Sequence, residues 1–314
     1  MIKTSKKISS SDLRKKSGFQ KHVVTQCYLL LIPEILGLFL FTLYPMYWAA
    51  KKSWFYYTGI ESMQKFIGWD NFIGVFNDPK YWSTWLTTLK FMFYKLPFEL
   101  PLAMVIALVL NKKLKGSGFF RAMYYLPNVI SVAIIGLIFS NMFDYFGFVN
   151  AWLIKFGLIE SEVSWMSTTY GAMTVLIIGA IWNTFGVNVM YFLAALSNVP
   201  EEMYEAAKLD GAGRFTVFFK ITLPMMAPVL QTIILLALNG SLHTSDYVLV
   251  TTNGAPGGTT FTVMSYIVNQ FVPGFAANSV NIGYGCAMSL VTSLFMCLFA
   301  IFYMKLSKKM ENIY

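Results

Sequence analysis

Polar side chains lie inside apolar stretches of this sequence, where they would have no water to bind. An unpaired amide or carboxylate in such surroundings costs free energy unless it faces a partner or a water-filled space. We therefore expect these side chains to point inward and to line a polar path. The candidates, with the aromatic residues beside them, are Trp182, Asn183, Asn188, Tyr191, Asn239, His243, Asp246 and Tyr247.

Charged side chains in the same stretches allow more than one chemistry. Lys95 and Glu99 are four residues apart on one helical face, which fits either an internal ion pair or a polar lining toward water. In a continuous helix, Asn239, His243 and Asp246 would also share one face. His243 near Asp246 could then relay protons, or it could make a hydrogen bond between helices.

The apolar stretches themselves are long enough to cross a membrane. The chain has 314 residues, of which 56% are hydrophobic and 12% charged, and its mean hydropathy is +0.57. A bilayer core of about 30 Å needs roughly 20 apolar residues per helix. The sequence therefore predicts an all-α integral membrane protein with about six transmembrane helices. The candidate spans are 27–50, 86–111, 122–143, 171–196, 225–250 and 283–304.

The net charge of +9 is explained by where the basic residues lie. Lys and Arg gather in four segments, residues 1–22, 111–121, 198–224 and 307–314. All four lie on one side if six helices alternate, and the positive-inside rule makes that side the cytoplasm. We expect cytoplasmic tails at 1–22 and 307–314 around one membrane domain, 23–306. The charge then favours attraction to anionic lipid over nucleic-acid binding.

The sequence offers little support for an enzyme. The three cysteines have no metal-ligand or redox spacing, which favours inert thiols in or beside the membrane. With two histidines and no nucleophile motif, a membrane enzyme is improbable. The phosphate-binding pattern G-x-x-x-x-G-K-[ST] is absent, so we expect this chain not to hydrolyse ATP itself. We also expect it to hold no metal and no cofactor. The basic start lacks an apolar core, so no cleavable signal peptide is expected before the first span.

The most polar long stretch between two apolar spans is 198–224, which reads NVPEEMYEAAKLDGAGRFTVFFKITLP. Asn198 is expected to cap a helix, and Pro200 suits its first turn. Gly211 is the expected left-handed stop of that helix, before a second helical segment. Pro224 is expected to mark the next boundary.

This stretch resembles the EAA loop of ABC importer permeases. The residues that carry the resemblance are Glu205, Ala206, Ala207, Asp210, Gly211, Ala212, Ile221, Leu223 and Pro224. In that family the loop is a cytoplasmic coupling helix, which docks in a groove on a separate ATP-hydrolysing subunit. The alternative is an ordinary amphipathic hairpin that only shapes the turn between two helices.

Two further segments are similar to the carbohydrate-uptake, maltose-type branch of these permeases. The segment 120–127 resembles the F-R-x-x-x-x-L-P pattern of that branch. The segment 68–72 resembles its G-x-x-N-F pattern. The fifth-helix exit departs from the family, because Ser245 precedes Asp246 where a Phe is usual. The matching residues are Phe120, Arg121, Leu126 and Pro127 in the first segment, and Gly68, Asn71 and Phe72 in the second.

The resemblance implies a type I ABC importer permease fold in the plasma membrane of a bacterium or archaeon. It also implies four kinds of partner: a second, similar permease, two ATP-binding subunits that hold ATP and magnesium, an extracytoplasmic solute-binding protein and a sugar substrate. A sugar presents C–H faces and a rim of hydroxyls, which suit aromatic platforms beside amides and carboxylates. The polar-path residues named above offer that chemistry.

A secondary transporter driven by an ion gradient is the main alternative. It would use the ionisable side chains of the membrane spans as a proton or ion relay. Such a transporter would work without ATPase subunits, and it leaves the 198–224 segment unexplained. The relay candidates are Lys95, Glu99, His243 and Asp246.

Overall fold

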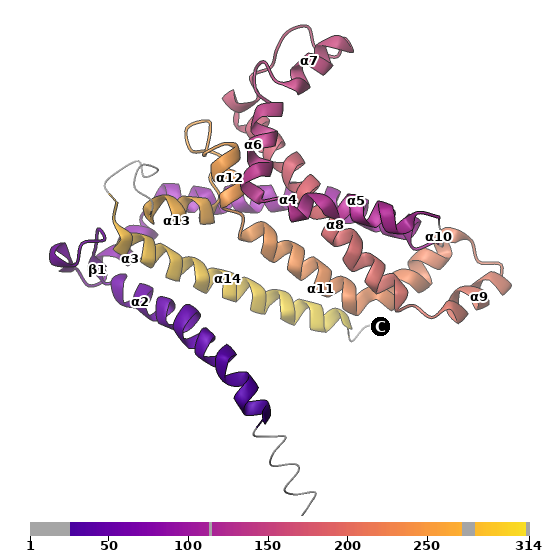
Figure 1. Cartoon of the computed structure of the whole chain (residues 1–314), viewed down its shortest axis with the longest axis horizontal. Helices are drawn as coiled ribbons and strands as arrows, with labels where there is room; N and C mark the ends of the chain where they lie inside the picture. Colours follow the sequence, from indigo (N-terminus) through magenta and orange to yellow (C-terminus); the bar gives the residue numbers. More distant parts are fainter. Residues whose placement is uncertain (1–25, 113–114, 272–279, 312–314) are drawn as a thin grey trace, which may run out of the picture.

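The structure is a computed structural model that describes residues 26–112, 115–271 and 280–311. The predicted tail 1–22 lies outside the described residues, and most of the predicted tail 307–314 continues the last helix (Figure 1). The elements in chain order are η1 (Phe39–Leu43), α2 (Tyr44–Lys52), β1 (Phe55–Tyr56), η2 (Glu61–Met63), β2 (Lys65–Phe66), α3 (Asp70–Phe76), α4 (Pro79–Leu110), α5 (Ser117–Val129), α6 (Val132–Met142), α7 (Phe148–Lys155), η3 (Trp165–Ser167), α8 (Thr169–Ser197), α9 (Glu201–Leu209), α10 (Arg214–Val217), η4 (Phe218–Thr222), α11 (Leu223–Leu242), α12 (Asp246–Thr251), α13 (Val263–Phe271) and α14 (Ile282–Glu311).

The membrane helices agree in number with the six predicted spans when one bent pair is counted as a span. Five helices within the described ranges are long and apolar enough to cross a bilayer. They are Gln26–Lys52, Pro79–Leu110, Thr169–Ser197, Arg214–Leu242 and Ile282–Ser307. The sixth candidate consists of α5 and α6, which meet at an angle of 92°.

The predicted span 122–143 consists of two helices, α5 and α6, with a bend between them. In a continuous helix the carbonyl of Pro127 would accept the backbone N–H of Ser131. Here it accepts the amide of Asn183 from α8 at 3.0 Å, together with the N–H of Ile130 at 3.3 Å. Ile130 is extended and Ser131 has a ψ of 134°, so neither residue is helical, and the side-chain amide takes the place of the lost helical bond.

The second span begins earlier than predicted, at Pro79 rather than at residue 86. Asp78 caps this helix, because its carboxylate accepts the backbone N–H groups of Lys80 at 2.8 Å and Tyr81 at 3.2 Å. Pro79 suits the first helical position, where its missing N–H leaves no bond unmade. The Asp-Pro pair was therefore a helix-start signal that the hydropathy of the segment concealed.

The fifth span differs most from the prediction of 225–250. Its helix starts at Arg214 and passes Pro224 without a break, because the π-helical turn η4 comes directly before α11. It ends at Leu242, and a separate helix, α12, starts at Asp246. Pro224 is thus not the predicted boundary.

The predicted helix start at Asn198 is also wrong by a few residues. Asn198 follows the end of α8 as its C-cap, and Pro200 is the N-cap of α9. The Asn198 N–H donates to the Ala195 carbonyl at 3.2 Å, so the residue belongs to the preceding helix. The prediction assigned an Asn before a polar run to the helix that follows it.

Helix α4 lies at the centre of the fold and takes part in three hydrophobic clusters. The first joins it to α8 and α11, the second to α6, α8 and α12, and the third to α3, α13 and α14. Phe91 belongs to the second cluster and Ala103 to the first, and both are fully buried. The stretch of α4 between these two residues is held firmly by its neighbours, and it carries Lys95 and Glu99.

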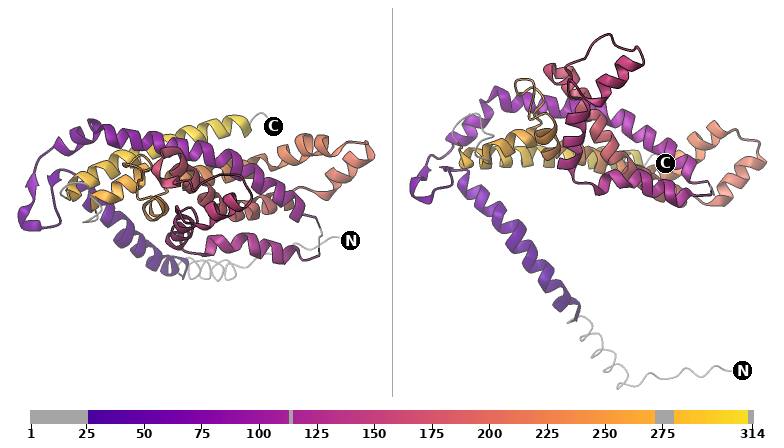
Figure 2. Two further views of the ribbon diagram at one scale, coloured as in Figure 1. Left: turned by 90° about the horizontal axis from the view of Figure 1, so that it is seen from above. Right: turned by 45° about the horizontal axis from the view of Figure 1, so that its top comes forward.

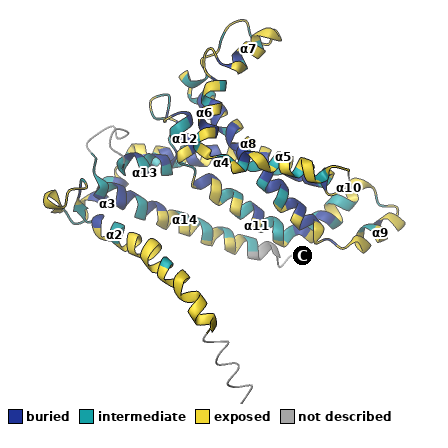
Figure 3. Ribbon diagram, viewed as in Figure 1, coloured by how far each residue is buried: buried dark blue, intermediate teal, exposed yellow. Residues whose placement is uncertain are grey.

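The first helix, Gln26–Lys52, leans away from the other helices (Figure 2). Its most apolar 18-residue window is 0% buried, whereas half of the corresponding window of α8 is buried. Figure 3 shows the contrast between this exposed helix and the buried faces of α4, α8 and α11. A large apolar surface is therefore left for lipid or for another chain to cover.

The segment between the first helix and α3, residues 53–69, contains the only strands of the described residues and is called the cap below. Strands β1 and β2 form an antiparallel pair, which the sequence did not reveal. The buried Asn71 amide donates to the carbonyls of Ser53 and Phe55, both at 2.9 Å. The asparagine of the G-x-x-N-F segment thus fixes the backbone of the cap to the start of α3.

Candidate functional site

A cavity of about 440 Å³, lined by both apolar and polar side chains, lies between α4, α8 and the junction of α11 with α12. Six of the eight residues predicted to line a polar path are on its wall. They are Asn183, Asn188, Tyr191, His243, Asp246 and Tyr247. The cavity therefore joins the two groups of residues that the sequence places more than fifty positions apart.

Trp182 and Asn239 are not among the residues that line this cavity. The Trp182 ring packs against Phe139 of α6, with ring centroids 5.7 Å apart. Asn239 is exposed, and its backbone carbonyl contacts the ring nitrogen Nδ1 of His243 at 2.9 Å. The expected shared face of Asn239, His243 and Asp246 does not form, because the helix ends at Leu242.

His243 and Asp246 do not form a proton relay in this structure. His243 contacts a carbonyl of its own helix, and the Asp246 carboxylate accepts the hydroxyl of Ser245 at 3.0 Å. The predicted hydrogen bond from His243 to another helix is not formed among the described residues either. Both side chains are exposed toward the cavity, where a solute could reach them.

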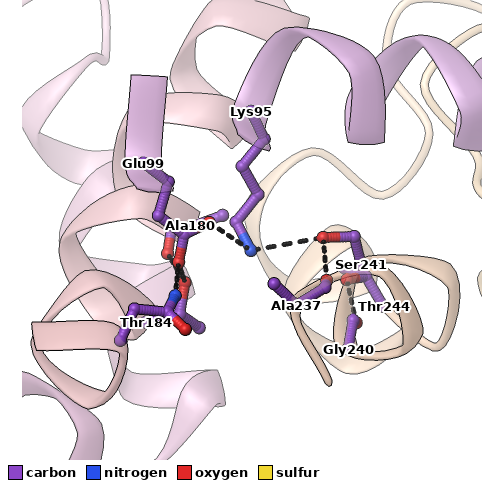
Figure 4. A network of polar contacts seen from close by, with 9 residues as sticks. Lys95, Glu99, Ala180, Thr184, Ala237, Gly240, Ser241 and Thr244 are labelled. Carbon is purple, nitrogen blue, oxygen red and sulfur yellow. Dashed lines mark hydrogen bonds and ion pairs between the residues drawn. The ribbon is translucent and has the colours of Figure 1, made fainter. Parts of the chain in front are cut away.

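Lys95 and Glu99 form an ion pair on the wall of the cavity, with Nζ 3.1 Å from Oε2. Lys95 is 4% exposed and Glu99 is 0% exposed. Lys95 also contacts the hydroxyl of Ser241 on α11 at 3.4 Å, as Figure 4 shows. The sequence allowed an ion pair or a polar lining as alternatives. In the structure, Lys95 and Glu99 form the ion pair and also line the cavity.

The second oxygen of Glu99, Oε1, connects α4 to α8. It accepts the Asn188 amide at 2.8 Å and the hydroxyl of Thr184. Thr184 lines the cavity and was missed from the predicted path, although it lies one helical turn before Asn188. Its polarity within an apolar span was the available signal.

Beyond the C-terminal end of α8, helix α9 and the turn after it form an exposed hairpin (Figure 1). Gly211 has a φ of +73°, as predicted for a left-handed stop. Its N–H donates to Lys208 at 3.2 Å, and the N–H of Ala212 donates to Ala207 at 2.9 Å. These two bonds form a Schellman motif, so the turn has one defined shape.

The residues of the predicted coupling segment differ in exposure. Ala207 is buried, whereas Glu205, Ala206 and Asp210 are exposed on the hairpin. Ile221, Leu223 and Pro224 lie in the continuous helix Arg214–Leu242. Beside the turn, Leu209 is 89% exposed and Phe215 is 82% exposed. The hairpin thus presents carboxylates and large apolar side chains together.

Residues 99–312 match the family described as "Binding-protein-dependent transport system inner membrane component". The chain belongs to this family. It is a multi-pass permease of the inner membrane and a subunit of an ABC importer, as predicted from the 198–224 segment. The cavity and the hairpin are therefore parts of a transport protein.

Characterised relatives align with this permease over most of both chains. It is 33% identical to the lactose transport system permease protein of Rhizobium radiobacter, over 83% of this chain and 89% of that one. It is 31% identical to the arabinooligosaccharides transport system permease protein of Bacillus subtilis, with 89% and 88% covered. It is 29% identical to the trehalose/maltose transport system permease protein of Thermococcus litoralis, with 90% and 93% covered.

The permease also shares its fold with a solved transporter. A chain of a bacterial ABC transporter involved in the import of the acidic polysaccharide alginate superposes with a TM-score of 0.78 at 21% identity. The match covers 94% of this permease and 99% of that chain. This likeness confirms the predicted type I importer permease fold.

Proposed function

We propose that this permease, paired with a second, similar permease, carries a sugar or oligosaccharide across the plasma membrane after an extracytoplasmic binding protein has delivered it. The named relatives that support this substrate class transport lactose, arabinooligosaccharides and trehalose or maltose. The cavity supports it further, because amides, carboxylates and the rings of Tyr191 and Tyr247 all line it. The six predicted residues that line the cavity are the proposed substrate contacts.

The observation that carries the proposal is the exposed hairpin around Gly211. Its rigid turn, its carboxylates and its uncovered apolar side chains suit docking on another protein. We propose that the hairpin docks on one of two ATP-binding subunits. These subunits hold ATP and magnesium. Closure of those subunits would move the hairpin, and the continuous helix Arg214–Leu242 would carry the movement to the cavity.

The proposed orientation places the hairpin and both termini in the cytoplasm. The last residues of α14 lie at the same end of the molecule as the start of α11, where the Tyr303 hydroxyl donates to the Gln231 carbonyl at 2.7 Å. The hairpin and this end of α14 both carry basic residues, such as Lys208 and Lys305. Basic residues at one end support a cytoplasmic location for it.

The test is Gly211→Pro in the reconstituted importer. Proline fixes φ near −65° and has no N–H, so it removes the turn and its bond to Lys208. We expect loss of substrate-stimulated ATP hydrolysis and of sugar uptake, with weaker binding of the ATP-binding subunits. Membrane insertion should remain normal.

The matched control is Gly157→Pro at the end of α7. Gly157 has a φ of +68° and forms the same motif, with the N–H of Leu158 donating to Leu153 at 2.9 Å. This turn lies far from the hairpin (Figure 1). We expect the control to retain coupled ATP hydrolysis. Uptake that persists in Gly211→Pro, or without ATP-binding subunits, would contradict the proposal and favour a gradient-driven transporter.

A further inference from the structure

A groove of about 1230 Å³ lies between α4, the end of α8 and the helical segment that leads from the hairpin into α11. It shares no lining residue with the cavity that holds Lys95 and Glu99. Most of its wall is apolar, with Met104 from α4, Phe192 from α8 and Leu230 from α11 as examples. A polar solute would find few partners on this wall, so the apolar groove suits an apolar occupant.

The apolar groove is about as long as one leaflet of a membrane is thick. It follows α4 from Leu100 to Lys112, and twelve residues that rise 1.5 Å each extend about 18 Å. On the opposite side it follows the helix from Leu223 to Ile234, which is about 16 Å. Half of a bilayer core of about 30 Å is about 15 Å. In the proposed orientation, the groove therefore runs from the cytoplasmic surface to the middle of the membrane.

All the charge on the wall of the apolar groove is positive and lies at its cytoplasmic end. Lys112 comes directly after the end of α4, Lys208 lies in the last turn of α9 and Arg214 begins α10. All three side chains are exposed, and none forms an ion pair with another described residue. No Asp or Glu of the described ranges lines the groove. Three uncompensated positive charges thus surround the mouth of an apolar groove.

An occupant with a negative end and a long apolar tail complements both features. An ATP-binding subunit lies outside the membrane, so it could cover the basic mouth but could not fill the apolar length. The first helix of a second copy is apolar enough, but it would bring the basic segment 1–22 toward the same three charges. Like charges would then meet at the cytoplasmic surface.

We propose that the apolar groove binds an anionic phospholipid of the cytoplasmic leaflet. Its phosphate lies among Lys112, Lys208 and Arg214, and one acyl chain follows α4 toward Leu100. Acyl chains gain little when they leave other lipid for an apolar wall, so the three charges select the headgroup. Because Lys208 and Arg214 flank the turn of the hairpin, the bound lipid joins the hairpin to α4. The inference rests on the proposed cytoplasmic location of the hairpin and goes beyond sugar transport.

The first experiment maps the lipid on the unmodified, complete importer in lipid nanodiscs. The probe is phosphatidylglycerol with a photoreactive diazirine at the end of one acyl chain, and phosphatidylcholine with the same chain is the control. We expect adducts near Leu100 and Ile234, at least fivefold more with the anionic lipid. Moving the diazirine next to the ester should move the adducts toward Leu108 and Phe218, which lie nearer the mouth.

Equal labelling by the two lipids would overturn the inference, because the groove would then be ordinary lipid-facing surface. Absence of adducts from the groove would overturn it as well, because another subunit would then cover the wall. Labelling does not depend on the transported solute. This inference and the proposed sugar transport can therefore fail separately.

The second experiment removes the positive charges one at a time. A basic residue near an anionic lipid surface is worth about fivefold in binding, so Lys112→Gln, Lys208→Gln and Arg214→Gln should each lower phosphatidylglycerol labelling by about that factor. High salt should lower it in the unmodified importer too. Lys220→Gln is the matched control, since Lys220 is exposed in η4 but does not line the groove. Unchanged labelling in the three variants, or an equal loss in the control, would exclude a specific headgroup site.

Discussion

At the scale of single residues, Gly211 shows how one backbone conformation can matter without any contact. Its φ is positive, and a Cβ placed there would meet nothing within 4 Å. A substitution therefore acts through the backbone alone. The left-handed conformation costs an ordinary L-residue about 1–2 kcal/mol, whereas Asn adopts it more readily.

We predict that Gly211→Asn retains binding of the ATP-binding subunits and that Gly211→Ala weakens it by roughly fivefold or more, which corresponds to about 1 kcal/mol. Affinity of the purified permease pair for those subunits is the measurement. Gly157→Ala controls for an effect of the same strain elsewhere in the chain. Equal binding by the Asn and Ala variants would show that the shape of the turn does not control docking.

A second residue-scale prediction concerns pH. Lys52 Nζ lies 2.8 Å from Glu61 Oε1, and its hydrogen bond holds the pKa of Glu61 below the ordinary value of 4.5. Because the pKa is lowered in the folded protein, the stabilisation is complete above the ordinary value and is lost as pH falls through the lowered one.

We therefore expect Glu61→Gln to lower the melting temperature slightly at neutral pH and not at all once the wild-type carboxylate is protonated. Melting curves of the wild type and of Glu61→Gln, recorded from neutral pH to below the pKa of Glu61, measure the difference in melting temperature. The effect is small because Glu61 is exposed. A difference that stays constant as the pH falls would contradict this account.

At the scale of elements, the close approach of α5 and α8 depends on Gly186. A Cβ at this position would lie 1.9 Å from the carbonyl oxygen of Tyr124, a backbone atom that cannot move by itself. We predict that Gly186→Ala separates the two helices and destabilises the permease by about 1–3 kcal/mol.

Thermal unfolding of the purified protein checks this prediction. Gly37→Ala is the matched control, since Gly37 is also helical and a Cβ there would meet nothing within 4 Å. The control should melt at or above the wild-type temperature, because alanine favours a helix over glycine. Similar melting of the two variants would refute close packing at Gly186.

Elements that depend on local sequence were predictable, and those that depend on distant contacts were not. Helix α8 was expected at 171–196 and spans Thr169–Ser197, because its hydropathy and its flanking turns agree. The break after Val129 requires the amide of Asn183, which belongs to another helix. No local pattern in the third span contains that information.

The site follows the same division. Asn188 was predicted to face a polar partner, but only the fold shows that Glu99 is that partner. Trp182 is next to Asn183, and successive helical residues point about 100° apart, so one can line a path while the other packs elsewhere. The Asp246 prediction assumed one continuous helix, and the cavity forms because that helix ends.

At the scale of the whole molecule, the first helix exposes more apolar surface than we would expect of a permease that works alone. Phe41 is 82% exposed and Leu30 is 80% exposed. Lipid can cover apolar side chains, but it cannot fix the angle of a helix with few protein neighbours. The proposed second permease would do both.

We predict that a photo-crosslinking amino acid at Phe41 captures the second permease in the membrane. The same substitution at Phe146, which is 85% exposed beyond the far end of α6, is the control for random collision. Cross-links are detected by mass spectrometry of the adduct. Capture at Phe146 but not at Phe41 would mean that the first helix meets only lipid.

The helix Arg214–Leu242 has one further consequence. Its 29 residues rise 1.5 Å each, so a single rod of about 43 Å has one end beside the hairpin and the other at the cavity. A push at one end reaches the other without crossing a loop. The π-turn η4 and Pro228 inside α11 are the two features at which such a helix can bend. The flexibility of the five residues of η4 thus affects how a movement of the hairpin reaches the cavity. Making this turn more rigid would change how far the cavity opens in each cycle of ATP hydrolysis.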